Sequence, residues 1–311
     1  MREVPRLVAV ETTNTCNARC SFCTNNRLAR SRRVMTDLLF EKIVDDCCAF
    51  PLDAIEPFLN GEPFTDPKIL QRLEHIRTRL PRTRLRLYTN GYALGRSKVD
   101  ALCGLGIDHL YVSLNSLDPE RYRAVMGLDL ELTLRNLDYL VVRRERVARR
   151  LTFRMTRTEE TTLAEQVAFK EYCNRVGVRA MIVGSFNYLG AVRSSLPVPG
   201  YPCEHISRLD VLADGRVALC CMDPEGFYAQ GDASREHVLE IFNGETARRV
   251  REMHRSGRRR ELEPCNMCNL FWPGLEELNL VDRIRFAAAS SGYFLRHHPI
   301  GVRAPRVSEG A

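Results

Sequence analysis

The chain has 311 residues, of which 44% are hydrophobic and 27% are charged. This size and composition allow one large or two modest globular domains with a hydrophobic core, and they exclude a small fold that needs disulfides. No apolar run approaches the ~20 residues of a membrane helix, and the N-terminus lacks the pattern of a signal peptide. We therefore expect a cytoplasmic protein without a membrane segment, whose twelve cysteines do not form disulfides.

The net charge of +7 arises from 46 basic and 39 acidic residues, and nearly all the basic ones are arginines. The densest arginine groups, within 143–150 and 258–260, contain no aromatic residue. Surfaces that bind nucleic acids commonly combine basic and aromatic side chains. We interpret these arginines as solvated helix faces and do not expect a nucleic-acid partner.

Short apolar or β-branched runs alternate with segments of helical periodicity over the first 184 residues. The predicted strands are 7–13, 54–59, 84–89, 109–113, 151–155 and 180–183, and the predicted helices are 37–50, 67–79, 97–105, 119–126, 130–147 and 163–176. This alternation predicts an α/β fold, in which helices cover a parallel sheet that is either open or a partial barrel. In both architectures ligands bind at the C-terminal ends of the strands.

A second, smaller module is predicted after Gly184. A proline-rich stretch over 197–202 resembles a linker, and the alternation over 209–219 around an Asp-Gly turn predicts a β-hairpin. A helix over 235–254 and a cysteine pair follow. We expect a barrel domain over 1–185, a hairpin-plus-helix module over 186–275, and a helix with a disordered tail over 276–311.

Cys16, Cys20 and Cys23 lie within eight residues directly after the first predicted strand. Three thiolates at this spacing can ligate three irons of one [4Fe-4S] cluster and leave the fourth iron without a protein ligand. A zinc site is the alternative, because Cys-x2-Cys pairs also bind zinc. The loop has no nearby fourth ligand, whereas structural zinc sites have four, so the spacing favours an iron-sulfur cluster.

This C-x3-C-x2-C spacing, with Phe22 before the third cysteine, resembles the signature of radical S-adenosylmethionine (SAM) enzymes. Asn60-Gly61-Glu62-Pro63 follows the second predicted strand, where that family has Gly-Gly-Glu-Pro. Residues 88–91 and 112–116 resemble the strand ends that line SAM in the family. The resemblance implies a partial (β/α)6 barrel in which SAM binds the open iron and yields a 5′-deoxyadenosyl radical that abstracts hydrogen from a substrate.

The same resemblance implies roles for individual residues. Gly61, Glu62 and Pro63 would contact the amino end of SAM, Ser113 and Asn115 its carboxylate or ribose, and Phe22 its adenine side, while Asn60 and Asn90 complete the SAM-binding set.

The second module resembles the twitch module, a shortened SPASM domain, in which G-x4-C supplies one cluster ligand. This resemblance implies a second [4Fe-4S] cluster held by Cys203, Cys220, Cys265 and Cys268. Cys221 is the alternative to Cys220, because one extra residue in the turn exchanges the two side chains. A zinc ribbon is the competing interpretation.

The remaining polar candidates are weaker. Cys221 is a candidate hydrogen donor, and Arg154 on the fifth strand and Glu204 beside Cys203 are candidate substrate contacts. We expect His254 to lie at the surface. The cysteines expected to pack in the core are Cys47, Cys48, Cys103 and Cys173.

Enzymes with such modules oxidise aminocyclitol carbinols, epimerise sugar carbons or modify peptides. The first predicted strand begins at Leu7, which leaves no space for a peptide-recognition domain, so we expect a small substrate. In its compact length and single auxiliary cluster, the chain resembles the radical SAM enzymes of aminoglycoside biosynthesis. We therefore expect a dehydrogenase that oxidises an aminocyclitol or amino sugar, with the auxiliary cluster as electron acceptor and a flavodoxin or ferredoxin as reducing partner.

Three alternatives stay open: an epimerase that uses a cysteine as hydrogen donor, a peptide-modifying maturase, and a non-catalytic iron-sulfur or zinc protein that binds nucleic acid.

Overall fold

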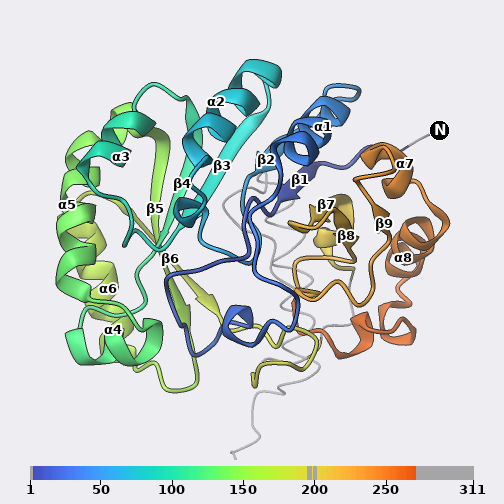
Figure 1. Cartoon of the computed structure of the whole chain (residues 1–311). Helices are drawn as coiled ribbons and strands as arrows, with labels where there is room; N and C mark the ends of the chain where they lie inside the picture. The colour runs from blue at the N-terminus through green and yellow to red at the C-terminus, as the bar shows by residue number, and fades with distance from the viewer. Residues whose placement is uncertain (1–2, 195–197, 199–201, 271–311) are drawn as a thin grey trace, which may run out of the picture. The chain divides into compact units, whose positions relative to one another are not determined.

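The computed structural model of the chain describes residues 3–194, 198 and 202–270 (Figure 1). Its first part alternates strands and helices, as the sequence pattern predicts. The strands are β1 (Leu7–Val10), β2 (Ala54–Glu56), β3 (Arg84–Thr89), β4 (Ile107–Ser113), β5 (Ala148–Arg157) and β6 (Arg179–Gly184). The helices are α1 (Asp37–Cys47), α2 (Ile69–Arg79), α3 (Arg96–Leu102), α4 (Pro119–Met126), α5 (Leu130–Val147) and α6 (Leu163–Arg175).

Strands β1 to β6 pair in parallel in the order β6-β5-β4-β3-β2-β1. Figure 1 shows the helices along the outer side of these strands. Val8, Ile55, Leu85 and Leu110 are fully buried in the core, as expected for strands that helices cover. Because all six strands run the same way, their C-terminal ends lie at one edge of the sheet, where the sequence places the candidate site.

Capping side chains explain where the helices begin. Thr36 accepts a hydrogen bond from the Leu39 amide at 3.4 Å at the start of α1. Asp118 accepts one from the Arg121 amide at 2.7 Å at the start of α4. Each cap satisfies a backbone amide that has no partner within the helix, and α1 and α4 therefore begin at the predicted residues.

The predicted hairpin is confirmed, and it belongs to the same sheet as the barrel. Strand β7 (Arg208–Val211) pairs antiparallel with β8 (Arg216–Ala218), which pairs with β9 (Gly231–Asp232). Gly215 in the turn has a φ of 97°, which favours glycine. Strand β7 also pairs in parallel with β1. The hairpin therefore extends the barrel sheet beyond β1 to nine strands.

The prediction of one helix over 235–254 is wrong. The structure has α7 (Val238–Phe242) and α8 (Glu245–Arg255) in this region. Gly244 separates them as the N-cap of α8, with extended backbone angles. A glycine without a side chain favours such a break over a continuous helix.

The chain also forms short 3-10 turns at Asn25–Arg27, Pro63–Thr65, Glu204–Ser207, Arg259–Glu261 and Cys265–Met267. The boundaries at 185/186 and 275/276 stay predictions, and the segment 276–311 lies outside the described residues. Within the described ranges, no helix combines the length and the apolar composition that crossing a membrane requires.

Candidate functional site

The loop with Cys16, Cys20 and Cys23 follows β1 at the C-terminal edge of the sheet. The Cys16 sulfur accepts a hydrogen bond from the Ala18 amide at 3.4 Å, and the Cys23 sulfur accepts one from the Asn25 amide at 3.4 Å. Burial, together with the nearby Glu62 and Cys23, raises the pKa of the Cys16 thiol to about 12, although the Ala18 amide and Arg32 oppose this rise. Thiols that lie close together and accept amide hydrogen bonds suit an iron-sulfur cluster, whose charge such bonds stabilise.

The helix α4 fixes this loop in place. The Arg19 amide donates to the Met126 carbonyl at 2.8 Å, and the Ser21 amide donates to the Val125 carbonyl at 2.9 Å. Backbone hydrogen bonds from both sides of Cys20 therefore fix the conformation of the cysteine loop.

The Asn60–Pro63 segment approaches the same loop so closely that only glycine fits at Gly61. A Cβ atom there would lie 2.1 Å from the Thr13 carbonyl oxygen and 2.7 Å from the Thr15 carbonyl oxygen. The next amide, of Glu62, donates to the Thr15 carbonyl at 2.8 Å. The segment thus lies directly against the start of the cysteine loop, and Pro63 is buried where it opens a 3-10 turn.

The Glu62 carboxylate connects this segment to the end of β3. It accepts hydrogen bonds from the Thr89 hydroxyl at 2.7 Å, the Asn90 amide at 2.7 Å and the Phe64 amide at 3.2 Å. Burial raises the pKa of Glu62 to about 7, although these hydrogen bonds lower it. Glu62 therefore holds two of the predicted SAM-binding segments together.

The other predicted SAM-binding residues gather at the same edge. The Asn90 side-chain amide donates to Asn17 of the cysteine loop at 2.7 Å. The Asn115 side chain accepts from the Thr156 amide at 2.7 Å and so links the ends of β4 and β5. Phe22 is half-buried and packs against the core. Ser113 lies opposite Arg154 in the register of β4 and β5.

Four cysteines of the second module line one small cavity. These cysteines are Cys203, Cys220, Cys265 and Cys268, the set that the sequence resemblance implies. The amide of Leu270 donates to the Cys268 sulfur at 3.4 Å. Four thiols that line one apolar-walled space, one of them with an amide donor, provide the ligand type that a fully ligated cluster needs.

The neighbouring Cys221 does not line this cavity. Its sulfur lies 3.3 Å from Nδ1 of His205. Cys220 and Cys221 both pack against the residues around Cys203 and Cys268, and His205 itself lines the cavity, so Cys221 lies beside the four-cysteine set without lining the cavity.

Two residues beside this cavity were missed by the sequence interpretation. His254 is fully buried rather than at the surface, and its Nδ1 accepts a hydrogen bond from the Cys203 amide at 3.0 Å. Arg259 is 1% exposed rather than solvated, and its guanidinium donates to the Cys268 carbonyl at 2.7 Å. A signal for His254 was available, because the buried residues of α8 recur with helical spacing: Ala247, Val250, Arg251 and His254.

The inner face of the sheet is charged. Glu56 of β2 lies 3.5 Å from the guanidinium of Arg86 and 3.3 Å from that of Arg208. Arg208 also contacts Asp210 at 2.7 Å. These buried pairs connect β2 and β3 of the barrel to β7 of the second module.

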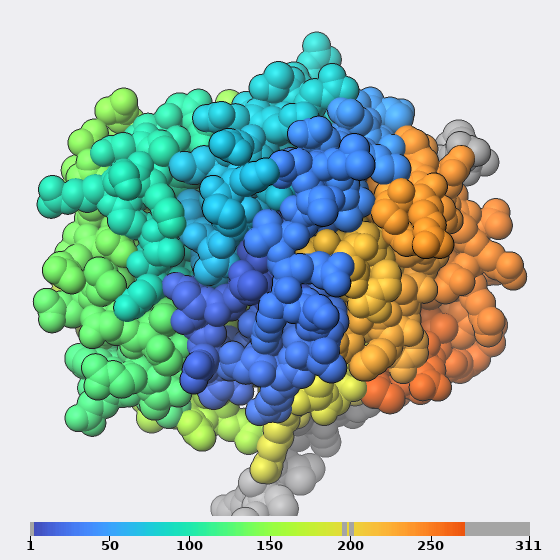
Figure 2. Space-filling model, in the orientation of Figure 1, coloured from blue at the N-terminus to red at the C-terminus, as the bar shows by residue number. Residues whose placement is uncertain are grey.

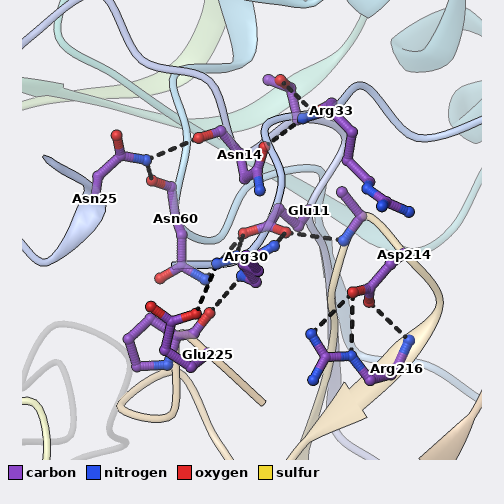
Figure 3. Close-up of polar contacts among 12 residues, drawn as sticks. Glu11, Asn14, Asn25, Arg30, Arg33, Asn60, Asp214, Arg216 and Glu225 are labelled. Atoms are coloured by element: carbon purple, nitrogen blue, oxygen red, sulfur yellow. Dashed lines mark hydrogen bonds and ion pairs between the residues drawn. The ribbon is translucent and has the colours of Figure 1, made fainter. Parts of the chain in front are cut away.

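A buried carboxylate, Glu11, joins the cysteine loop to the second module (Figure 3). It accepts hydrogen bonds from the guanidinium of Arg30 at 2.7 and 2.5 Å, from the Asn60 side-chain amide at 2.9 Å and from the Ala213 amide at 2.8 Å. Glu225 of the second module accepts from the Arg30 amide at 3.2 Å. Asn60, which stands where the resembling family has glycine, is therefore part of this network.

One further side chain, Tyr188, lies near both cysteine sets. Tyr188 packs against the cluster of residues around Cys203 and Cys268 and has a φ of 44°, which is unusual for a non-glycine residue. Burial raises the pKa of its hydroxyl, Cys23 and Cys221 raise it further, and Arg154 opposes them. Tyr188 therefore lies near thiols of both sets, and Arg154 lies close enough to Tyr188 to affect the pKa of its hydroxyl.

The other candidates lie elsewhere. Glu204 is exposed at the start of its 3-10 turn. All twelve cysteines are free, and Cys48 is exposed instead of packing in the core. Within the described ranges, no group of three or more His, Cys, Asp or Glu side chains could hold a metal ion in the arrangement that the structure shows.

Comparison with known families matches two regions of the chain. A model of the radical SAM superfamily matches residues 10–156, and a model of SPASM, an iron-sulfur cluster-binding domain, matches residues 203–269. Together the two matches cover more than half of the chain and include both cysteine sets.

Curated relatives resemble parts of the chain. The GTP 3′,8-cyclase of Streptomyces coelicolor is 28% identical over 124 residues, which are 39% of this chain and 36% of that protein. The probable GTP 3′,8-cyclase of Methanococcus vannielii is 26% identical over 186 residues, which are 58% of this chain and 59% of that protein. The chain therefore spans between about a third and three fifths of the length of these relatives.

Solved structures share the fold over most of the chain. BtrN in complex with AdoMet and 2-DOIA has a TM-score of 0.62 at 19% identity, covering 87% of this chain and 95% of that one. Streptococcus suis SuiB bound to the precursor peptide SuiA has a TM-score of 0.68 at 13% identity, covering 86% and 70%. At these identities the likeness shows the fold, and it confirms the predicted fold class.

Proposed function

Because the chain belongs to the radical SAM superfamily and carries a SPASM iron-sulfur module, we propose that it oxidises a carbinol carbon of a small aminocyclitol or amino sugar to a ketone. In this proposal Cys16, Cys20 and Cys23 ligate a [4Fe-4S] cluster that binds SAM, and Cys203, Cys220, Cys265 and Cys268 ligate a second one. When bound, these groups supply the radical that abstracts the carbinol hydrogen and the acceptor for the electron left on the substrate.

The observation that carries this proposal is the four-cysteine cavity. Four thiols around one space leave no iron open for a substrate, so electron transfer is the role that suits a cluster there. The cavity wall includes the apolar side chains of Leu189, Ile206, Leu219 and Val250. An apolar shell limits solvent access and thereby tunes the reduction potential of a buried cluster.

In this proposal Arg154 binds the reacting hydroxyl. It lies on β5 opposite Ser113, and within the described part of the chain its buried Nε atom has no hydrogen-bond partner. A buried donor without a partner is costly, and a substrate oxygen would satisfy it. The guanidinium charge would also favour loss of the hydroxyl proton, because it stabilises the negative oxygen.

A small substrate is supported by the likeness to BtrN, whose crystallised complex contains AdoMet and 2-DOIA. The curated relatives named GTP 3′,8-cyclase match only part of their own length, and the SuiB complex contains a peptide. We therefore place cyclisation of GTP and peptide modification behind oxidation of an aminocyclitol.

Epimerisation is the second candidate, and Cys221 favours it. This thiol lies beside the four-cysteine cavity without lining it, and its sulfur is 3.3 Å from Nδ1 of His205. A thiol that no cluster consumes is able to donate a hydrogen atom to the opposite face of a substrate radical. In that reaction the product has the same mass as the substrate.

Product mass and stoichiometry test the proposal. The anaerobically reconstituted enzyme is incubated with SAM, a reductant and a panel of aminocyclitols that includes 2-DOIA. We expect a product two hydrogens lighter and one 5′-deoxyadenosine per product. A product of unchanged mass that gains one deuterium from D2O, and that Cys221→Ala abolishes, would establish the epimerase instead. The Cys48→Ala variant is the matched control, because Cys48 belongs to neither set.

A further inference from the structure

The loop that carries Cys16, Cys20 and Cys23 is strongly basic. Between Glu11 and Asp37 the chain contains five arginines and no Asp, Glu or Lys, whereas basic and acidic residues number 46 and 39 over the whole sequence. The five are Arg19, Arg27, Arg30, Arg32 and Arg33. This local excess of positive charge surrounds the three cysteines in sequence.

Four of these arginines are exposed, and only Arg30 turns inward to pair with Glu11. Figure 2 shows this N-terminal segment, in dark blue and blue, on one face of the molecule. In Figure 3 the Arg33 side chain points away from the buried network. We call Arg19, Arg27, Arg32 and Arg33 the arginine surface.

Neutral acceptors hold part of the arginine surface in place. The Arg27 guanidinium donates to the Ala191 carbonyl at 3.2 Å, and the Arg32 guanidinium donates to the Asn14 carbonyl at 2.7 Å and to the Asn25 side chain at 3.0 Å. Carbonyl and amide oxygens fix the side chains and leave their charge in place.

Carboxylates do not cancel this charge within the described ranges. No ion pair that the described residues form involves the arginine surface. Glu225, which contacts the loop, is occupied by the Ala29 amide at 2.7 Å and the Arg30 amide at 3.2 Å. The arginine surface therefore presents uncompensated positive charge to solvent.

We propose that the arginine surface is the docking site for a small acidic protein that carries one electron, of the flavodoxin or ferredoxin class. This inference rests on the proposed function, because a cluster that starts radical chemistry receives its electron from outside the protein. In the transfer the carrier loses one electron and the cluster gains it, and no bond is formed or broken.

Charge complementarity is the physical basis of the proposal. Opposite charges across an interface accelerate association and orient the partner. Salt weakens such an interface, because at physiological ionic strength the screening length is about 8 Å. The three cysteines are only partly buried, so a protein that docks on this loop lies next to their cluster.

The test is a double charge reversal, Arg27→Glu with Arg33→Glu. Neither residue is a predicted ligand of the cluster or a predicted SAM contact. The control is Arg82→Glu with Arg146→Glu, two exposed arginines that precede β3 and β5. They therefore lie toward the N-terminal ends of the strands, whereas the cysteine loop lies at the C-terminal ends. Isothermal titration calorimetry of the anaerobic holoenzyme with a purified flavodoxin gives the dissociation constant without any substrate.

We expect the reversal to weaken flavodoxin binding about tenfold in low salt, and high salt to weaken wild-type binding similarly. The control should bind flavodoxin as wild type does. SAM cleavage driven by the small reductant dithionite should be unchanged, while the KM for flavodoxin rises. Equal binding by wild type and the charge-reversed variant, or wild-type binding that is insensitive to salt, would overturn the proposal.

Two measurements keep the outcomes separate. If iron content falls in the charge-reversed variant, the milder Arg27→Gln with Arg33→Gln is titrated instead, and unchanged binding there counts against the proposal. A single-stranded DNA 20-mer that binds more tightly than flavodoxin and is lost in the same variant would assign the surface to nucleic acid instead. Flavodoxin binding by a protein that oxidises no aminocyclitol would support the docking site and refute only the proposed substrate.

Discussion

Replacement of Glu11 by Gln tests whether the buried network of Figure 3 couples the cysteine loop to the second module. The Glu11 side chain is 0% exposed and that of Arg30 is 7% exposed, so neither charge is solvated. The substitution removes one charge and leaves the Arg30 guanidinium buried without its partner. Breaking a buried pair in this way typically costs about 3–5 kcal/mol.

The contacts of Glu11 indicate that the free energy of unfolding falls by an amount within this range. Its carboxylate accepts four hydrogen bonds, from two guanidinium nitrogens of Arg30, the Asn60 side chain and the Ala213 amide. A glutamine has one oxygen to accept these bonds, and its NH2 group would face donors. We therefore expect the free energy of unfolding to fall by about 3 kcal/mol or more.

Urea unfolding of the anaerobic protein, followed by circular dichroism, measures this loss. The control is Arg6→Gln, which breaks the exposed pair between Arg6 and Asp53, 73% and 50% exposed. An exposed pair contributes about 0–1 kcal/mol, so this variant should unfold close to wild type. A Glu11→Gln variant that unfolds within about 1 kcal/mol of wild type would refute the reasoning.

Three further outcomes are expected. Gly61→Ala should lose SAM binding in equilibrium dialysis, because its Cβ would lie 2.1 Å from the Thr13 carbonyl oxygen; SAM binding at the wild-type level would contradict this close approach. Cys220→Ala should retain only the iron of the first cluster, about four per chain, whereas Cys221→Ala should retain all of it, and the reverse pattern would exchange their roles. Burial, followed by the charges of nearby arginines, lowers the pKa of His109 from 6.5 to about 4. The unfolded chain therefore takes up the proton first as pH falls from 6.5 toward 4, and stability should drop by up to about 3 kcal/mol, measured as urea unfolding at pH 7 and pH 4.5. His109→Gln should lack this extra loss, and a wild-type protein as stable at pH 4.5 as at pH 7 would argue against it.

The sequence by itself determined the elements whose signals are local. Apolar periodicity predicts the helices to within a few residues, because a helix is formed by neighbours three and four positions apart. The two cysteine sets are visible for the same reason, since most ligands of one cluster lie on short loops. A local Asp-Gly turn likewise predicted the hairpin of β7 and β8.

Local patterns also gave wrong predictions for a segment whose residues contact parts of the chain that are distant in sequence. The helix expected over 235–254 is interrupted at Gly244. His254 and Arg259 belong to a polar, arginine-rich stretch that reads as surface, yet both are buried against the four-cysteine cavity. His254 accepts a hydrogen bond from the Cys203 amide, and Arg259 donates one to the Cys268 carbonyl. The composition of the segment that contains His254 and Arg259 does not predict these partners.

Only the tertiary structure decided how the two parts of the chain are joined. The pairing of β7 with β1 and the hydrogen bond from Ala213 to Glu11 connect residues about 200 positions apart. It also decided that Cys220 lines the cavity and that the sulfur of Cys221 lies 3.3 Å from Nδ1 of His205. Such contacts depend on which strand edges and side chains lie next to each other in the folded chain, and the spacing of residues along the sequence does not predict this arrangement.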